Sequence, residues 1–190
     1  MGKSRERIII CPYDAQDWSS HEVWVNDTTL RFGSIHALIN NAGIGSSKTL
    51  RSVTEQDLDE IWAINCKAPL HMIQLCLPFL ERTGSGRILN IASLSGKRVR
   101  NDHIAYNMSK FAVLALSHAT RRISWELGVR CTALCPSFVF TDMTMGSDKI
   151  SAADMINATD LAELAHSLMS LPNTASVAEI MVNCRLEDTV

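Results

Sequence analysis

Apolar residues follow two alternating patterns along the chain, short continuous runs and longer stretches with helical spacing. The short runs, rich in aliphatic and β-branched residues, predict buried strands at residues 8–11, 36–39, 87–92, 129–135 and 179–183. Between them, apolar positions with helical spacing predict helices at residues 18–32, 54–82, 106–127 and about 159–171. Strands that alternate with helices predict an α/β fold with a doubly wound, mostly parallel sheet.

Residues with known capping preferences mark several helix ends. Gly33 and Gly128 are predicted to stop the helices that precede them. Thr54 to Asp57 has the form of a capping box. Thr159 is predicted to cap the last helix, which Pro172 ends.

The helical segments at residues 69–82 and 106–127 both have more apolar positions than one core-facing stripe needs. The predicted core stripe consists of Phe111, Ala115, Ala119, Ile123 and Leu127. Val113, Leu114 and Leu116 fall outside that stripe. Surplus apolar surface on a long helix is typical of an interface, so a homodimer or homotetramer is expected.

Composition and charge narrow the class of protein. The 190 residues are 46% hydrophobic and 20% charged, with a net charge of −2, which predicts one globular domain over residues 1–190. This balance predicts neither a nucleic acid nor a membrane as a partner, and the short basic cluster at residues 97–100 is expected to be a solvated loop. The six Cys form no Cys-x-x-Cys pair and the His show no ligand spacing, so we expect reduced thiols, a cytoplasmic location and no metal site.

Candidate chemistry gathers between Ser93 and Lys110. Ser93 follows a predicted strand, and Tyr106 and Lys110 lie one turn apart on one face of the next helix. A phenol with a pKa near ~10 needs a drop of about 3 units to act as a base near neutrality. A nearby ammonium can supply a shift of that order. An ordinary helix pair is the alternative, but with two Tyr in the chain a chance match with an upstream Ser is rare.

The order of motifs resembles the short-chain dehydrogenase/reductase family from about residue 8 to residue 190. Ser93 with Tyr106-x-x-x-Lys110 matches the family's active-site pattern, and residues 40–43 read Asn-Asn-Ala-Gly as in the family's turn. Asn65 lies where the family has a helical Asn. Residues 135–141 resemble its Pro-Gly-x-x-x-Thr segment, with Ser137 in place of the Gly.

The resemblance implies an oxidoreductase that moves hydride between NAD or NADP and a small-molecule carbonyl or alcohol substrate. Tyr106 would exchange the proton, Lys110 would lower its pKa and bind the nicotinamide ribose, Ser93 would polarise the carbonyl and Asn65 would hold a relay water. Residues 142–157 would form a lid over the substrate. The implied cofactor-binding residues are Asp14, Asn41, Ala42, Gly43, Tyr106, Lys110, Pro136, Val139 and Thr141. Without the family resemblance, the residues around Asp14 are explained equally well as the start of a helix whose N-cap is Asp17.

One expected part of the Rossmann-like fold has no counterpart in this sequence. None of the nine Gly falls in the glycine-rich turn that binds pyrophosphate after the family's first strand, and the second strand is not found either. The domain is therefore interpreted as N-terminally incomplete, and these 190 residues are expected to bind NAD(P) weakly on their own.

Two other functions remain open at this point. A relative that binds a ligand or partner without catalysis would share the fold, and the absent glycine turn favours that alternative. An epimerase or dehydratase would use the same trio, but usually carries a larger C-terminal substrate region. Hydride exchange with a panel of substrates separates these hypotheses.

Overall fold

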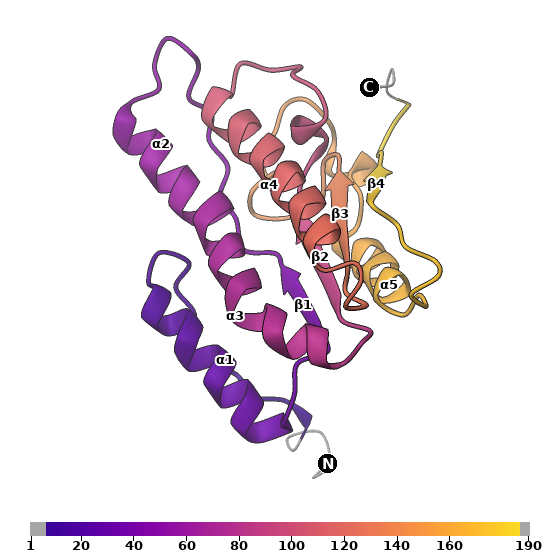
Figure 1. Cartoon of the computed structure of the whole chain (residues 1–190). Coiled ribbons are helices and arrows are strands. Elements are labelled where there is room, and N and C mark those ends of the chain that lie inside the picture. Colours follow the sequence, from indigo (N-terminus) through magenta and orange to yellow (C-terminus); the bar gives the residue numbers. More distant parts are fainter. Residues whose placement is uncertain (1–6, 187–190) are drawn as a thin grey trace.

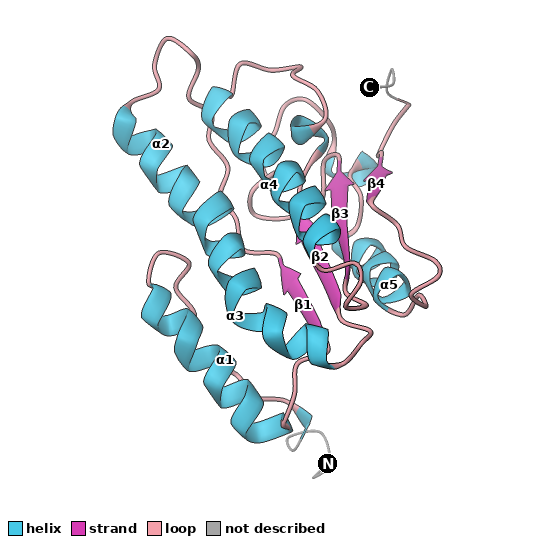
Figure 2. Ribbon diagram, in the orientation of Figure 1, coloured by secondary structure: helices cyan, strands magenta, loops and turns pink. Residues whose placement is uncertain are grey.

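Four strands form one parallel sheet whose spatial order follows the chain order. A computed structural model describes residues 7–186. The strands β1 (Ala37–Asn40), β2 (Arg87–Ile91), β3 (Arg130–Pro136) and β4 (Glu179–Val182) are neighbours in that order. All three pairings are parallel, so the strands end at the same edge of the sheet (Figure 2). The predicted α/β fold is confirmed.

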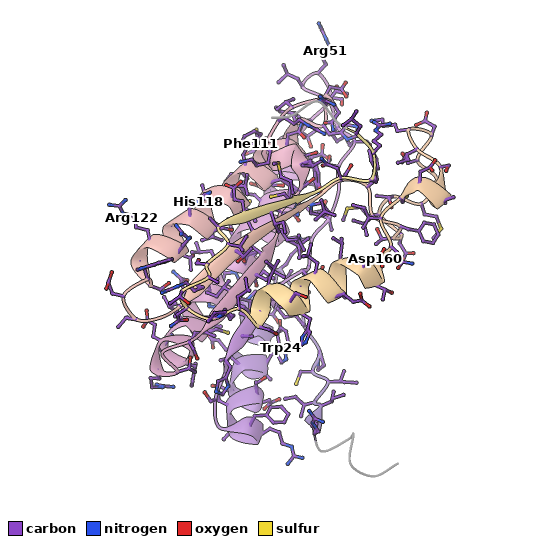
Figure 3. All side chains as sticks on the ribbon, turned by 90° about the vertical axis from the view of Figure 1, so that its right-hand side faces the viewer. Trp24, Arg51, Phe111, His118, Arg122 and Asp160 are labelled. Carbon is purple, nitrogen blue, oxygen red and sulfur yellow. The ribbon has the colours of Figure 1, made fainter. Side chains whose placement is uncertain are left out.

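Helices cover both faces of this sheet (Figure 1). The α-helices are α1 (Trp18–Phe32), α2 (Glu55–Trp62), α3 (Ala68–Arg82), α4 (Ile104–Ile123) and α5 (Ala158–Met169). Figure 3 views the sheet nearly edge-on, with α4, which carries Phe111 and His118, on one side and α5, which carries Asp160, on the other. None of the helices in residues 7–186 is long and apolar enough to cross a membrane.

Alternate residues of β2 supply the two halves of the core. Ile88 is 1% exposed and packs with apolar residues of α1 and α3. Leu89 is fully buried and packs on the opposite face with Leu134 and Leu168, the latter from α5. Because successive side chains of a strand point to opposite faces, a central strand with both faces covered is apolar at nearly every position. This explains the continuous apolar runs in the sequence.

A capped, continuous helical rod runs from α2 to α3. Thr54 and Asp57 form the predicted capping box, in which each side chain accepts from the other residue's backbone N–H. A π-helical turn, Ala63–Lys67, joins the two helices, and Pro69 falls in the first turn of α3. A π-helical turn places an extra residue in the helix and turns the side chains around it, which is common at functional sites.

The predicted strand at residues 8–11 is not formed. Ile8 is 62% exposed and Ile10 95% exposed, although both are strongly apolar. A strand needs a neighbouring strand to satisfy its backbone, and in the described residues β1 pairs only with β2. Within residues 7–186, the apolar run pairs with no strand, and the outer edge of β1 also has no partner strand.

The prediction for α4 was wrong about both its end and its buried face. The helix ends at Ile123, and the C-cap residue Ser124 leaves the helical conformation with φ −101° and ψ 6°. The predicted core stripe is exposed, with Phe111 at 43% and Ile123 at 73%. The buried face instead consists of Ala105, Asn107, Ser109, Lys110, Val113, Leu114, Ser117 and Thr120. Small and polar residues on this face allow the helix to approach the sheet closely.

The last helix begins and ends earlier than predicted. Asn157, not Thr159, is the N-cap of α5, and its side chain accepts from the Thr159 backbone N–H. The helix ends at Met169, three residues before Pro172. Two residues with capping side chains that lie two positions apart cannot be separated by composition alone.

Candidate active site

The predicted site residues gather where β1, β2 and β3 end. Residues 41–43 follow β1, Ser93 follows β2 and residues 137–141 follow β3. Open α/β sheets bind ligands outside the carboxyl ends of their strands. The topology therefore brings together three segments that are far apart in the chain.

Ser93 and Tyr106 meet at this edge. Ser93 caps the short 3-10 helix Leu94–Gly96 by accepting from the Ser95 backbone N–H. Tyr106 lies in the first turn of α4. Burial raises the pKa of the Tyr106 phenol, while a hydrogen-bonding interaction with the Ser93 hydroxyl lowers it. Burial has the larger effect, so the phenol is protonated over the neutral range.

Lys110 lies one turn further along α4, but its ammonium does not act on the phenol as predicted. The Nζ atom donates a 2.9 Å hydrogen bond to the Ile91 carbonyl and lies 5.6 Å from the centroid of the Tyr106 ring. The side chain is buried, which lowers its pKa to about 8. The expectation that Lys110 depresses the Tyr106 pKa is wrong for this arrangement, in which that pKa is raised.

Asn65 joins the π-helical turn to the loop after β1. Its Oδ1 accepts from the Ile44 backbone N–H at 2.9 Å, and its Nδ2 donates to the Ile44 carbonyl and to the Ser109 hydroxyl, both at 3.0 Å. Only 2% of the residue is exposed. A buried amide satisfied on both atoms explains why a poor helix former lies inside a helical rod.

Gly43 is needed for space and not for a special backbone conformation. Its φ is not positive, unlike those of Gly33, Gly84, Gly128 and Gly146. A Cβ at this position would lie 3.3 Å from Asn65 Oδ1 and 3.8 Å from Lys110 Nζ. The bare backbone at Gly43 therefore lies directly against two of the predicted catalytic side chains.

A pocket of about 760 Å³ opens beside the phenol. Ser93, Tyr106 and Pro136 line it together with Phe138 and Met143 from the segment after β3. This volume is within the usual range for small-molecule sites. Asn65 and Lys110 are not among the lining residues, which places them behind the pocket wall.

The remaining predicted cofactor residues are more dispersed. Asp14 is exposed before α1, where its carboxylate accepts from the Gln16 backbone N–H at 2.8 Å and the Asp17 side chain is the N-cap. Val139 forms a single bridge with Ile156, and Thr141 is exposed. Asp14, Val139 and Thr141 are not among the residues that line the pocket.

The basic cluster at residues 97–100 is not the plain solvated loop that was expected. Lys97 is partly buried and pairs with Glu179 at 2.6 Å, while Arg98 and Arg100 line the pocket. The position of this cluster, only four to seven residues after Ser93, was a usable signal in the sequence. The six Cys are free thiols, and no cluster of three or more possible metal ligands occurs in residues 7–186.

Sequence comparison associates the chain with one enzyme family. The family model described as short chain dehydrogenase matches residues 1–151. An agropine synthesis reductase of Rhizobium rhizogenes is 41% identical over 187 residues, which cover 98% of this chain. The same alignment covers 44% of the reductase, so the chain spans less than half the length of that relative.

Solved structures agree with this fold. An alcohol dehydrogenase from the archaeon Thermococcus sibiricus, complexed with 5-hydroxy-NADP, matches with a TM-score of 0.80 and 26% identity, covering 89% of this chain and 71% of the other. A 3-ketoacyl-(acyl-carrier-protein) reductase from Brucella melitensis, complexed with NADH, matches with a TM-score of 0.84 and 24% identity, covering 92% and 76%.

Proposed function

The chain belongs to the short-chain dehydrogenase family, and we propose that it is an NAD(P)-dependent oxidoreductase that interconverts a carbonyl compound and an alcohol. The observation that carries the proposal is the meeting of the Ser93 hydroxyl and the half-buried Tyr106 phenol in the wall of the pocket. A protonated phenol beside a second hydroxyl suits proton donation to a carbonyl oxygen as that oxygen gains negative charge.

In the reducing direction, Tyr106 would transfer its phenolic proton to the carbonyl oxygen. When bound, the nicotinamide supplies the hydride that the carbonyl carbon accepts. Ser93 would donate a hydrogen bond to the same oxygen and polarise the carbonyl. The raised pKa of Tyr106 supports this role, because the phenol is in its acid form before the reaction.

Asn65 and Lys110 would support the cofactor side of the site. The Lys110 ammonium is held by the Ile91 carbonyl, and the backbone at Gly43 leaves space beside Asn65 and Lys110 that a Cβ would fill. These features fit a nicotinamide ribose close to the chain, with Lys110 as its donor. Asp14, Asn41, Ala42, Pro136, Val139 and Thr141 are proposed as further cofactor contacts, as the family resemblance implies.

Hydride transfer can be measured directly on the expressed protein. NADH or NADPH is mixed with a panel of ketones and aldehydes, and loss of the reduced cofactor is followed by absorbance. Consumption that depends on the carbonyl compound, and that Tyr106→Phe removes, supports the proposal. Equal carbonyl-dependent rates in the two proteins would overturn the role of Tyr106, whereas no rate in either protein while ligands still bind would favour a non-catalytic binding protein.

A homo-oligomer and a cytoplasmic location belong to the same proposal. Met108, Phe111 and Ile123 leave an apolar strip on the outer side of α4, with exposed fractions of 45%, 43% and 73%. This strip supports self-association, although it differs from the residues that the sequence pattern predicted. Free thiols at all six Cys support a reducing compartment.

A further inference from the structure

Four cationic side chains gather around the pocket that contains the phenol. Arg98 and Arg100 come from the loop after β2, Lys149 from the segment after β3, and Arg185 from the residues after β4. Asp148 is the one carboxylate among the described residues that line this pocket. Cationic side chains therefore outnumber carboxylates among the described residues of this pocket wall, although the whole chain has a net charge of −2.

The three arginines are close enough to influence one another. The pKa of Arg98 is lowered first by burial and then by the positive charges of Arg100 and Arg185. Placing like charges together costs free energy, because each raises the cost of charging the others. The planar guanidinium group matches both carboxylate and phosphate oxygens, so an anion held by several of these arginines would gain from each of them.

The loop that presents Arg98 and Arg100 is held at both ends. At its start, Lys97 pairs with Glu179 of β4 at 2.6 Å. At its end, Asn107 of α4 donates to the carbonyl and the side chain of Asn101, at 3.3 and 3.0 Å. A loop fixed in this way presents its charges with less loss of conformational freedom on binding.

The position of the cations favours the substrate over the cofactor as their ligand. The pocket is lined by Ser93 and Tyr106 but not by Gly43 or Lys110, which lie on the proposed nicotinamide side. A molecule in this pocket would therefore meet the catalytic hydroxyls and the arginines together.

We propose that the substrate is a carbonyl or alcohol compound that carries a carboxylate or phosphate group, which Arg98, Arg100 and Arg185 bind. The inference rests on the proposed function, because it assigns the substrate class of the same pocket. The cations would orient the substrate and distinguish acidic from neutral carbonyl compounds of similar size.

The test uses paired probes that differ in one anionic group, levulinate with methyl levulinate and dihydroxyacetone phosphate with dihydroxyacetone. In the wild-type protein, the kcat/KM of at least one acidic probe should exceed that of its neutral partner. The double variant Arg100→Gln, Arg185→Gln should lower the value for that acid by about tenfold or more, chiefly through KM, and change the neutral partner about twofold or less. Both residues are exposed, so the fold should tolerate the change. Arg122→Gln, at an exposed arginine of α4 outside the pocket (Figure 3), is the matched control and should behave as wild type.

A binding measurement separates this inference from the proposed reaction. Calorimetric titration of the acidic probes into Tyr106→Phe should show binding that the added arginine variants weaken by a similar factor, even where turnover is absent. Equal binding of acidic and neutral probes would overturn the inference. So would a double variant that raises the KM of NADPH but not of NADH, because the arginines would then hold the cofactor's extra phosphate.

Discussion

The Lys110 ammonium lies 5.6 Å from the centroid of the Tyr106 ring and donates its hydrogen bond to the Ile91 carbonyl. The two groups thus share one helix face but are held by different partners. Lys110 is positioned by the backbone of β2, and the Tyr106 phenol interacts with Ser93. In the proposed reaction, the ammonium would therefore contact the cofactor and the phenol would contact the substrate.

Cofactor affinity should decrease above about pH 8. Burial lowers the pKa of Lys110 to about 8, so the ammonium loses its proton in a range where an exposed lysine stays charged. The dissociation constant of NAD(P)H, measured by quenching of Trp fluorescence against pH, should rise through that value. Lys110→Met should bind more weakly at every pH without this step. A flat wild-type profile between about pH 7 and 9.5 would show that the charge does not contribute.

The lowered pKa of Lys110 weakens cofactor binding at high pH but has the opposite effect on the stability of the fold. Because the folded pKa of Lys110 lies below the unfolded value, the unfolded chain binds this proton more tightly, and this residue's contribution to stability rises with pH from about 8 to the unfolded pKa. Weaker cofactor binding at high pH therefore cannot be attributed to unfolding caused by Lys110.

Tyr106→Phe should reduce kcat by at least about 100-fold, because the phenol is the proposed proton donor. The loss of its interaction with Ser93 should cost only about 1 kcal/mol of unfolding free energy. Kinetics and thermal unfolding of the same preparation measure both effects. The control is Tyr13→Phe at the only other tyrosine of the chain, which should retain activity. A folded Tyr106→Phe protein with most of its turnover would refute the assignment.

Asn65→Ala should destabilise the fold by about 1–3 kcal/mol, because it leaves the Ile44 backbone groups without their side-chain partner. Urea unfolding measures the change. Asn183→Ala, at an exposed position, should change the free energy of unfolding by about 0.5 kcal/mol or less. If the two variants were equally stable, the hydrogen bonds of Asn65 would have no net value for folding.

Stability should also fall as the pH drops below about 6.5. The buried rings of His21 in α1 and His71 in α3 approach to 3.0 Å between their Nδ1 atoms. Burial and the neighbouring His21 lower the pKa of His71, while Glu22 opposes this in part. The unfolded chain therefore binds the proton more tightly, and the contribution of His71 is present above its unfolded pKa and lost below it.

Urea unfolding at about pH 7.5 and 5.5 tests this dependence. His71→Phe should have a smaller pH slope than the wild type, and His166→Phe, on α5 at the far side of the sheet, should keep it. An unchanged slope in His71→Phe would show that other groups cause the acid sensitivity.

Phe111→Glu should weaken self-association. It places a carboxylate in the apolar strip on the outer side of α4, where Phe111 is 43% exposed. Light scattering at micromolar concentration should show a larger species for the wild type and a mass near 21.0 kDa per chain for the variant of these residues. A wild-type protein that is already monomeric would exclude the proposed assembly.

Local patterns in the sequence were sufficient for most of the alternation of strands and helices and for the placement of the proposed trio. Ser93 lies just after β2, and Tyr106 and Lys110 are one turn apart on α4, so the proximity of the phenol and the ammonium follows from short-range geometry. The capping box at Thr54 and the stop at Gly33 were predictable for the same reason, since each depends on a few neighbouring residues.

Tertiary structure decided whatever depended on a distant partner. Residues 8–11 have strand composition but pair with no strand in the part of the chain that the structure describes, and the buried face of α4 is the one that fits against the sheet. The same holds for Asn65, which finds its partner at Ile44, and for Arg185, which reaches the pocket that Arg98 lines. Backbone pairing, exclusion of water and clustering of charge depend on what lies opposite in space, and no local stretch of sequence contains that information.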